Sequence, residues 1–145
     1  MKEGTHLIYY PDPSRRTVVL GMRFGLSTSQ PLAALAGLEV YLRGGSAVDA
    51  ALAAAIALTV VEPTSNGIGG DALAIVWDGK AEGLNSTGKS PSHLPPLSQL
   101  GEGRRELGWA AVTVPGAVAA WRALWEKWGR LPFPELFASA IRYAR

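Results

Sequence analysis

Two runs of sequence decide the fold: Gly44-Gly45-Ser46-Ala47-Val48-Asp49-Ala50-Ala51 and, after further alanines, Val61-Glu62-Pro63-Thr64-Ser65-Asn66-Gly67-Ile68-Gly69-Gly70-Asp71. Ser46 is placed to cap a helix, and Asp49, three positions later, makes a close variant of the capping box. Alanine on nearly all sides lets this helix pack closely against several neighbours, so we expect it in the middle of the core. Pro63 ends the helix, because the residue before a proline is pushed out of the α region.

The segments on either side alternate between strand and helix patterns. We expect strands over residues 17–23, 25–29, 71–77, 80–85 and 109–114, and helices over residues 30–42, 46–61, 115–128 and 135–145. Asp78-Gly79 is a strong signal for a hairpin turn. The stretch over 86–107 is a long connection rich in turn residues and charges, of the kind that is often functional. Strands interleaved with helices predict a layered α/β (α+β) arrangement.

Two of the expected helices carry an apolar stripe at helical spacing. The first stripe is leucine throughout: Leu32, Leu35, Leu38 and Leu42. The second is mostly aromatic: Val118, Trp121, Trp125 and Trp128. We interpret the aromatic stripe as a core face in preference to a ligand cage, because each ring can remove about 150–250 Å² from water.

Composition narrows the function classes. The chain has 145 residues, 48% of them apolar and 18% charged, with a mean hydropathy of +0.11. Such a chain folds, and it has enough apolar residues to predict that some apolar surface meets a partner or further chain. The 14 basic residues are nearly balanced by 12 acidic ones, and the net charge is +2. We therefore expect no nucleic-acid partner.

Metal, membrane and secretion signals are weak. The sequence has no cysteine, and its two histidines, His6 and His93, are far apart, so we expect no metal and no cofactor. The longest apolar run, over residues 47–61, is shorter than the ~20 residues of a membrane span. The first residues lack the apolar segment of a signal peptide. We expect a cytoplasmic protein with no membrane contact.

The glycine turn over residues 66–71 is the first candidate site. Its glycines allow close approach of backbone to another chain or a ligand. As a phosphate cradle it is weak, because the sequence predicts a strand after it, whereas nucleotide loops precede a helix. A tight packing turn is the ordinary alternative. Asp49 and Glu62 are interpreted as helix-end residues in preference to general bases.

The loop over residues 85–91 is the second candidate, at the end of an expected strand. Lys89 has the charge to hold an anionic substrate group, and Ser86 or Thr87 can add hydrogen bonds. The competing interpretation is a solvated loop with one surface lysine. Taken alone, these residues predict an α/β domain and no specific function.

Several longer motifs together resemble the γ-glutamyltransferase family. They are PLAALAG (31–37), GGSAVDAALAA (44–54), VEPTSNGIGG (61–70), VTVPGA (112–117), GRLP (129–132) and LFASAI (136–141). The resemblance runs from about residue 18 to residue 145, with the motifs in family order. It implies an N-terminal-nucleophile (Ntn) hydrolase with an αββα sandwich, of which residues 1–145 are only the N-terminal portion, an incomplete domain.

The resemblance also implies a mechanism and partners. Such enzymes are made as a precursor that cleaves itself into a large and a small subunit, and the new N-terminal threonine of the small subunit attacks a γ-glutamyl amide. We expect this chain to be the start of the large subunit, inactive alone, with the threonine lying beyond residue 145. No catalytic residue is therefore assigned. The implied partners are the remainder of the large subunit, the small subunit, and a small γ-glutamyl or other acyl amide substrate.

One departure from the family pattern bears on specificity. Members that use glutathione place an arginine about where Thr87 stands, and here the basic residue is Lys89, two positions later. Lysine is a point charge and does not replace the arginine fork. The pattern LNSTGKSP (84–91) looks more like the acylase-like branch, which argues against glutathione as the substrate but not against acyl transfer from γ-glutamyl or similar amides. We assign Lys89 and Thr87 as substrate contacts. A non-catalytic domain that binds a partner or a small anion is the alternative.

Overall fold

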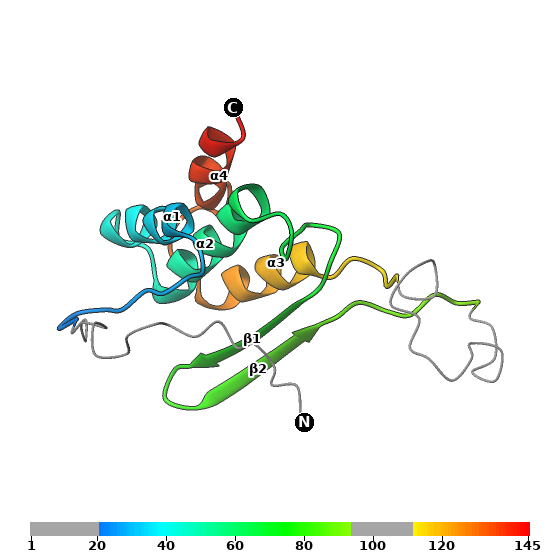
Figure 1. Ribbon diagram of the computed structural model, residues 1–145. Coiled ribbons are helices and arrows are strands. Elements are labelled where there is room, and N and C mark those ends of the chain that lie inside the picture. The colour runs from blue at the N-terminus through cyan, green and yellow to red at the C-terminus, as the bar shows by residue number, and fades with distance from the viewer. Residues whose placement is uncertain (1–20, 94–111) are drawn as a thin grey trace, which may run out of the picture.

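A layer of helices packed on one β-hairpin makes up the part of the chain that the structure, a computed structural model, describes: residues 21–93 and 112–145 (Figure 1). The elements in order are α1 (Pro31–Leu42), α2 (Ala47–Val61), β1 (Ala72–Trp77), β2 (Ala81–Ser86), α3 (Ala117–Trp128), the 3-10 helix η4 (Phe133–Phe137) and α4 (Ala138–Tyr143). The mixed helix and strand arrangement confirms the predicted fold class.

The ends of α1 and α2 follow the signals in the sequence. Pro31 occupies the first turn of α1, where a missing N–H costs nothing, and Gly44 ends the helix with φ of +93°. The Ser46 hydroxyl accepts a hydrogen bond from the Asp49 N–H at 3.0 Å, and the Asp49 carboxylate accepts one from the Ser46 N–H at 2.9 Å. This reciprocal pair confirms the capping box.

The face of α1 that packs on α2 consists of small residues. Ala33, Ala36 and Gly37 are buried, and a Cβ at Gly37 would lie 2.7 Å from the carbonyl oxygen of Ala50. The leucine stripe of α1 faces away: the exposed leucines are Leu32, Leu35 and Leu42. The stripe is therefore not the packing face of α1, because close backbone contact between the two helices requires the small residues between them.

Helix α2 lies at the centre of the helical layer. It packs against α1, α3, η4 and α4, and its buried residues include Leu52, Ala53 and Ile56. The prediction of a central alanine-rich helix is confirmed, although Ala51 is exposed, so one side of α2 stays open. Glu62 is the C-terminal cap, immediately before Pro63 as expected.

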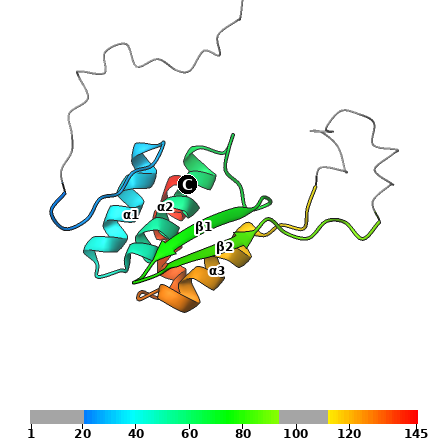
Figure 2. The same ribbon diagram turned by 90° about the horizontal axis from the view of Figure 1, so that it is seen from below.

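The hairpin is antiparallel, with Ala72 opposite Ser86 and Trp77 opposite Ala81. Its three-residue turn contains Gly79 with φ of +77°, which confirms the predicted hairpin. Figure 2, which is seen from below, shows the two strands in front of α2 and next to α3. Alternate residues face these helices, and the opposite face of β1 carries large exposed side chains: Leu73, Ile75 and Trp77.

Helix α3 brings its aromatic stripe to the core only in part. Trp121 is buried, Trp125 and Trp128 are partly buried against the same core, and Val118 is exposed. The core continues into the C-terminal elements, where the rings of Phe133 and Phe137 meet edge to face at 5.1 Å. The interpretation of the stripe as core is confirmed for its tryptophans.

Four predicted elements differ from the structure. The last helix, expected over 135–145, is a 3-10 helix containing Pro134 followed by the short α4. Residues 21–23 and 25–29 form no strand; Phe24 instead stacks on Tyr41 at 4.2 Å, so this segment lies along α1. Residues 112–114 form no strand either. The rest of those predicted strands, residues 17–20 and 109–111, lies outside the described residues, as does 94–107 of the long connection. No helix within the described ranges is long and apolar enough to cross a membrane.

Candidate functional site

Three segments meet at one end of the hairpin. These are the glycine turn (66–71), the last residue of β2 with the loop that follows it (86–89), and the segment entering α3 (113–117). We call the place where the three segments meet the three-loop junction. The N–H groups of Gly116 and Ala117 both donate to the carbonyl oxygen of Gly70, at 2.9 and 3.1 Å. The Val114 N–H donates to the carbonyl oxygen of Lys89 at 2.9 Å. Figure 1 shows the chain that leaves β2 running beside the chain that enters α3.

The two predicted substrate contacts lie in this junction. The Thr87 N–H donates to the side-chain oxygen of Asn85 at 3.0 Å, which forms a tight turn at the end of β2. Thr87 is half-buried, and Lys89 is exposed. The Ser86 hydroxyl, the other hydrogen-bonding group considered for a substrate, already donates to the carbonyl oxygen of Gly116 at 2.8 Å. The structure thus brings Thr87 and Lys89 into one ordered loop, and their contact with a substrate stays a prediction.

The glycine turn has the geometry of a packing turn. Strand β1 follows it directly, and it presents the carbonyl oxygen of Gly70, not an N–H group, to the first turn of α3. A nucleotide loop needs the reverse, N–H groups at the start of the helix that follows the turn. The nucleotide-binding alternative is therefore contradicted. The turn instead supplies acceptors for α3 donors that have no partner within the helix.

A small cavity of about 180 Å³ lies beneath the glycine turn. Thr59, Asn66 and Trp121 are among the residues that line it. Two of its polar side chains serve the fold: the Thr59 hydroxyl donates to the carbonyl oxygen of Ile56 at 2.8 Å, and the Asn66 amide to that of Glu62 at 3.1 Å. The cavity thus lies between α2 and the turn, and the side chains of Thr59 and Asn66 in its wall are already hydrogen-bonded to backbone carbonyl groups.

Neither acidic candidate is placed as a general base. Asp49 is fully buried, and its Oδ2 atom accepts hydrogen bonds from the N–H groups of Ser46, Arg130 and Leu131. Glu62 accepts a hydrogen bond from the Ser29 hydroxyl at the end of α2. Both are helix-end residues, as predicted. The hydrogen bonds from Arg130 and Leu131, in the connection between α3 and η4, to Asp49 could not be predicted from the sequence. Their donors are backbone N–H groups, which every residue except proline has.

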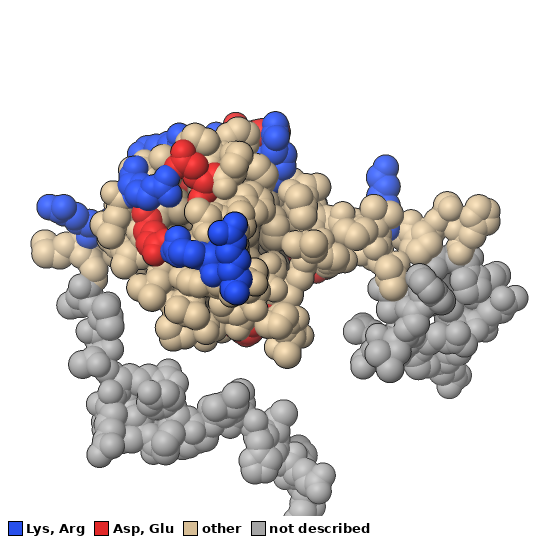
Figure 3. Space-filling model, turned by 90° about the horizontal axis from the view of Figure 1, so that it is seen from above, with Lys and Arg blue, Asp and Glu red and all other residues tan. Residues whose placement is uncertain are grey.

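The charged side chains over the helices alternate in sign (Figure 3). Arg142 binds Glu39 at 2.7 Å and Arg43 binds Glu135, so these charges are largely paired. The hydrogen bond from Arg142, with help from the Ser139 hydroxyl, holds the pKa of Glu39 below its ordinary value. Within the described residues no group of three or more His, Cys, Asp or Glu side chains is placed to bind a metal ion.

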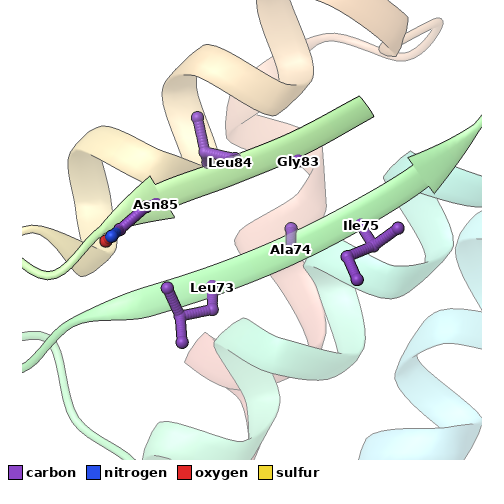
Figure 4. A pocket seen from close by; sticks show the side chains of 6 residues that line it. All are labelled: Leu73, Ala74, Ile75, Gly83, Leu84 and Asn85. Carbon is purple, nitrogen blue, oxygen red and sulfur yellow. The ribbon is translucent and has the colours of Figure 1, made fainter. Parts of the chain in front are cut away.

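A shallow groove of about 610 Å³ runs along the hairpin (Figure 4). It is lined by Leu73, Ala74, Ile75, Gly83, Leu84 and Asn85. Leu73 and Ile75 project from β1 away from Leu84, which points toward α3. Leu73 is 70% exposed and Ile75 84% exposed, values far above those of a core residue. The groove ends at Asn85, beside the three-loop junction.

A family model described as gamma-glutamyltranspeptidase matches residues 33–145, which include all the helices and strands described above except the first two residues of α1. The chain belongs to the gamma-glutamyltranspeptidase family. This confirms the resemblance seen in the sequence motifs. Those motifs lie at structurally demanding positions: the α1–α2 contact, the capping box, the glycine turn and the entry to α3.

Solved structures related to the chain come from both branches of the family. Cephalosporin acylase from Bacillus halodurans is 50% identical with a TM-score of 0.77, over 94% of this chain and 26% of that chain. Gamma-glutamyltranspeptidase from Helicobacter pylori is 31% identical with a TM-score of 0.79, over 88% of this chain and 39% of that one. The gamma-glutamyltranspeptidase form of the Ntn-hydrolase fold is thereby confirmed.

The curated relatives of the chain likewise include a glutathione hydrolase and an acylase. The glutathione hydrolase proenzyme of Bacillus subtilis (strain 168) is 33% identical over 129 residues, which is 82% of this chain and 22% of the relative. The acylase ACY 1 proenzyme of Pseudomonas sp. (strain V22) is 35% identical over 138 residues, 86% of this chain and 25% of the relative. The chain therefore spans about a quarter or less of these relatives. Both relatives are named as proenzymes.

Proposed function

We propose that this chain supplies part of the substrate site of an enzyme that hydrolyses or transfers acyl groups from their amides. The observation that carries the proposal is the three-loop junction. It holds the loop with Thr87 and Lys89 in place within a fold that belongs to the gamma-glutamyltranspeptidase family. A loop at the end of a strand, fixed to a helix by backbone hydrogen bonds, suits a substrate site because it is positioned by rigid elements.

In this proposal the nucleophile is a threonine in the part of the family's length that the chain does not cover. Its hydroxyl oxygen attacks the amide carbonyl carbon, the carbon–nitrogen bond breaks, and the released amine takes the hydroxyl proton. Water, or an amine acceptor, then attacks the resulting ester and frees the threonine. Residues of this chain bind and orient the acyl group, and none is the nucleophile.

The acyl group in this proposal carries an anionic end, which Lys89 binds as a point charge while Thr87 adds a hydrogen bond. Support comes from the exposure of Lys89 in an otherwise well-fixed loop and from the lack of an arginine at position 87. An arginine would grip an α-carboxylate with two parallel hydrogen bonds, and a lysine does not. The 50% identity with cephalosporin acylase favours acyl groups other than the γ-glutamyl group of glutathione.

The test is steady-state kinetics of the complete enzyme that carries this chain, with anilides of anionic and neutral acyl groups. Lys89→Ala should raise KM for the anionic substrate by roughly 10- to 100-fold, the equivalent of a charge-assisted hydrogen bond of about 1.5–3 kcal/mol. KM for the neutral substrate should stay the same. Lys80→Ala is the matched control, because Lys80 is an exposed lysine at the opposite end of the hairpin. An unchanged kcat/KM for the anionic anilide in Lys89→Ala would contradict the proposal.

We also propose that the remaining polypeptide of the enzyme covers the outer face of the hairpin. A two-stranded sheet is marginally stable by itself, and here one of its faces exposes Leu73, Ile75 and Trp77. Further strands or a second sheet would bury these side chains. The same face supports the second candidate function, a non-catalytic domain whose partner is a different protein; the state of the isolated chain distinguishes the two.

A further inference from the structure

Two glycines of the three-loop junction stand where backbone meets backbone. Gly88 has φ of +77°, and a Cβ atom built on it would lie 1.7 Å from the carbonyl oxygen of Val114. A Cβ atom on Gly116 would lie 2.1 Å from the carbonyl oxygen of Ser86. Real Cβ contacts essentially never fall below 3.0 Å. Since both opposing atoms are backbone, no change of side-chain rotamer relieves either contact.

The two contacts are interlocked. Gly88 lies in the loop after β2 and opposes the segment entering α3, whereas Gly116 lies in that segment and opposes the end of β2. Between them run the hydrogen bonds from Val114 N–H to the Lys89 carbonyl and from the Ser86 hydroxyl to the Gly116 carbonyl, at 2.9 and 2.8 Å. The loop is therefore attached to the entry of α3 at two points on either side of Thr87.

We propose that Gly88 and Gly116 are positioning residues that set the place of Thr87 and Lys89 relative to the start of α3. Through that placement they determine how well the enzyme binds the acyl end of its substrate. The inference rests on the proposed function, in which Lys89 contacts the substrate. A side chain at position 88 or 116 would push the loop away from α3, and the Lys89 ammonium group would move with it. A misplacement of about 1 Å can cost an enzyme as much as about 100-fold, and here the group displaced is one that binds the substrate, so the loss should appear in KM.

The chain offers a matched control for the strain in Gly88→Ala. Gly79 has the same φ of +77° at the tip of the hairpin, and a Cβ there would meet nothing within 4 Å. Gly79→Ala therefore introduces the same unfavourable backbone conformation without displacing the loop. In the complete enzyme, Gly88→Ala should raise KM for the anionic anilide by roughly 10- to 100-fold with kcat nearly unchanged. Gly79→Ala should leave both constants unchanged.

A double-mutant cycle separates positioning from a general loss of structure. If Gly88 acts by placing Lys89, then adding Lys89→Ala to Gly88→Ala should change KM by less than about twofold, because the lysine contact has already been lost. If the fold-changes of KM in the two single variants multiply in the double variant, the two residues act independently and the inference is overturned. So would a Gly88→Ala enzyme whose KM equals that of Gly79→Ala.

Ser86→Ala provides a milder variant in case Gly88→Ala does not fold. It removes only the hydroxyl that donates to Gly116, and we expect a several-fold rise of KM in the same direction. No rise in Ser86→Ala, while Lys89→Ala does raise KM, would contradict positioning and leave the proposed function intact. If Lys89→Ala itself has no effect, the proposed function fails and this inference fails with it.

Discussion

The Oδ2 atom of Asp49 lies 2.8 Å from the backbone nitrogen of Arg130, a residue 81 positions later in the sequence. The same oxygen accepts a hydrogen bond from Leu131 N–H at 3.1 Å and from Ser46 N–H at 2.9 Å. One carboxylate therefore joins the start of α2 to the connection between α3 and η4. Its other oxygen, Oδ1, is buried without a hydrogen-bond partner.

Asp49→Ala should lower the free energy of unfolding by roughly 3–5 kcal/mol, because three backbone N–H groups would lose the buried carboxylate that accepts their hydrogen bonds. Ser46→Ala, which removes only the helix cap, should cost about 1 kcal/mol. Urea unfolding monitored by tryptophan fluorescence measures both. Equal losses for the two variants would mean that the long-range hydrogen bonds contribute nothing beyond the cap.

Gly37→Ala tests the close contact between α1 and α2. Alanine has the better helix propensity by about 1 kcal/mol, yet its Cβ would lie 2.7 Å from the Ala50 carbonyl oxygen. We expect a net destabilisation of about 1–3 kcal/mol, since the opposing atom is backbone and the helices must separate. Gly83→Ala is the control, because a Cβ there meets nothing within 4 Å. A stabilised Gly37→Ala protein would show that the two helices are more loosely packed.

Ile75→Lys tests whether the outer face of the hairpin is an interface. In residues 1–145 produced alone, the side chain is 84% exposed, so this charge should reduce self-association without loss of secondary structure. In the complete enzyme the same change should destabilise the fold by several kcal/mol, because it buries an unpaired charge. Sedimentation velocity and near-ultraviolet circular dichroism provide the readouts. A stable, monomeric wild-type chain with fixed aromatic signals would favour the non-catalytic alternative.

Acid should weaken the contact between α1 and α4. Arg142 lowers the pKa of Glu39 from its ordinary value of 4.5, so the carboxylate form is favoured in the folded protein. The stabilisation is complete above pH 4.5 and is lost as the pH falls through the lowered pKa. Glu39→Gln should therefore lower Tm at neutral pH and reduce the further loss of Tm below about pH 4. Arg142→Met should have the same two effects on Tm. If the losses of Tm in the two single variants add up in the double variant, Glu39 and Arg142 do not stabilise the protein as a pair.

The local signals of the sequence were sufficient for the helix ends and the hairpin. The capping box of Ser46 and Asp49, the stop at Pro63 and the turn at Gly79 depend on neighbours within a few residues, so a single sequence contains them. The motifs around these positions were also enough to place the chain in its family. Short segments without periodicity were less predictable: residues 25–29 were expected to form a strand, but within residues 21–93 and 112–145 they pair with no other strand.

Only the tertiary structure decided which surfaces meet. Helical periodicity identifies the leucine stripe of α1, but the small face around Gly37 packs instead, because the Ala50 carbonyl approaches closer than a leucine would allow. The donors to Asp49 are backbone groups some eighty residues away, and the partners of Gly88 and Gly116 belong to other segments. The sequence by itself determined the ends of α1 and α2, the hairpin and the family, since these depend on local chemistry. The packing faces and the three-loop junction depend on contacts between distant residues, which form only when the chain has folded.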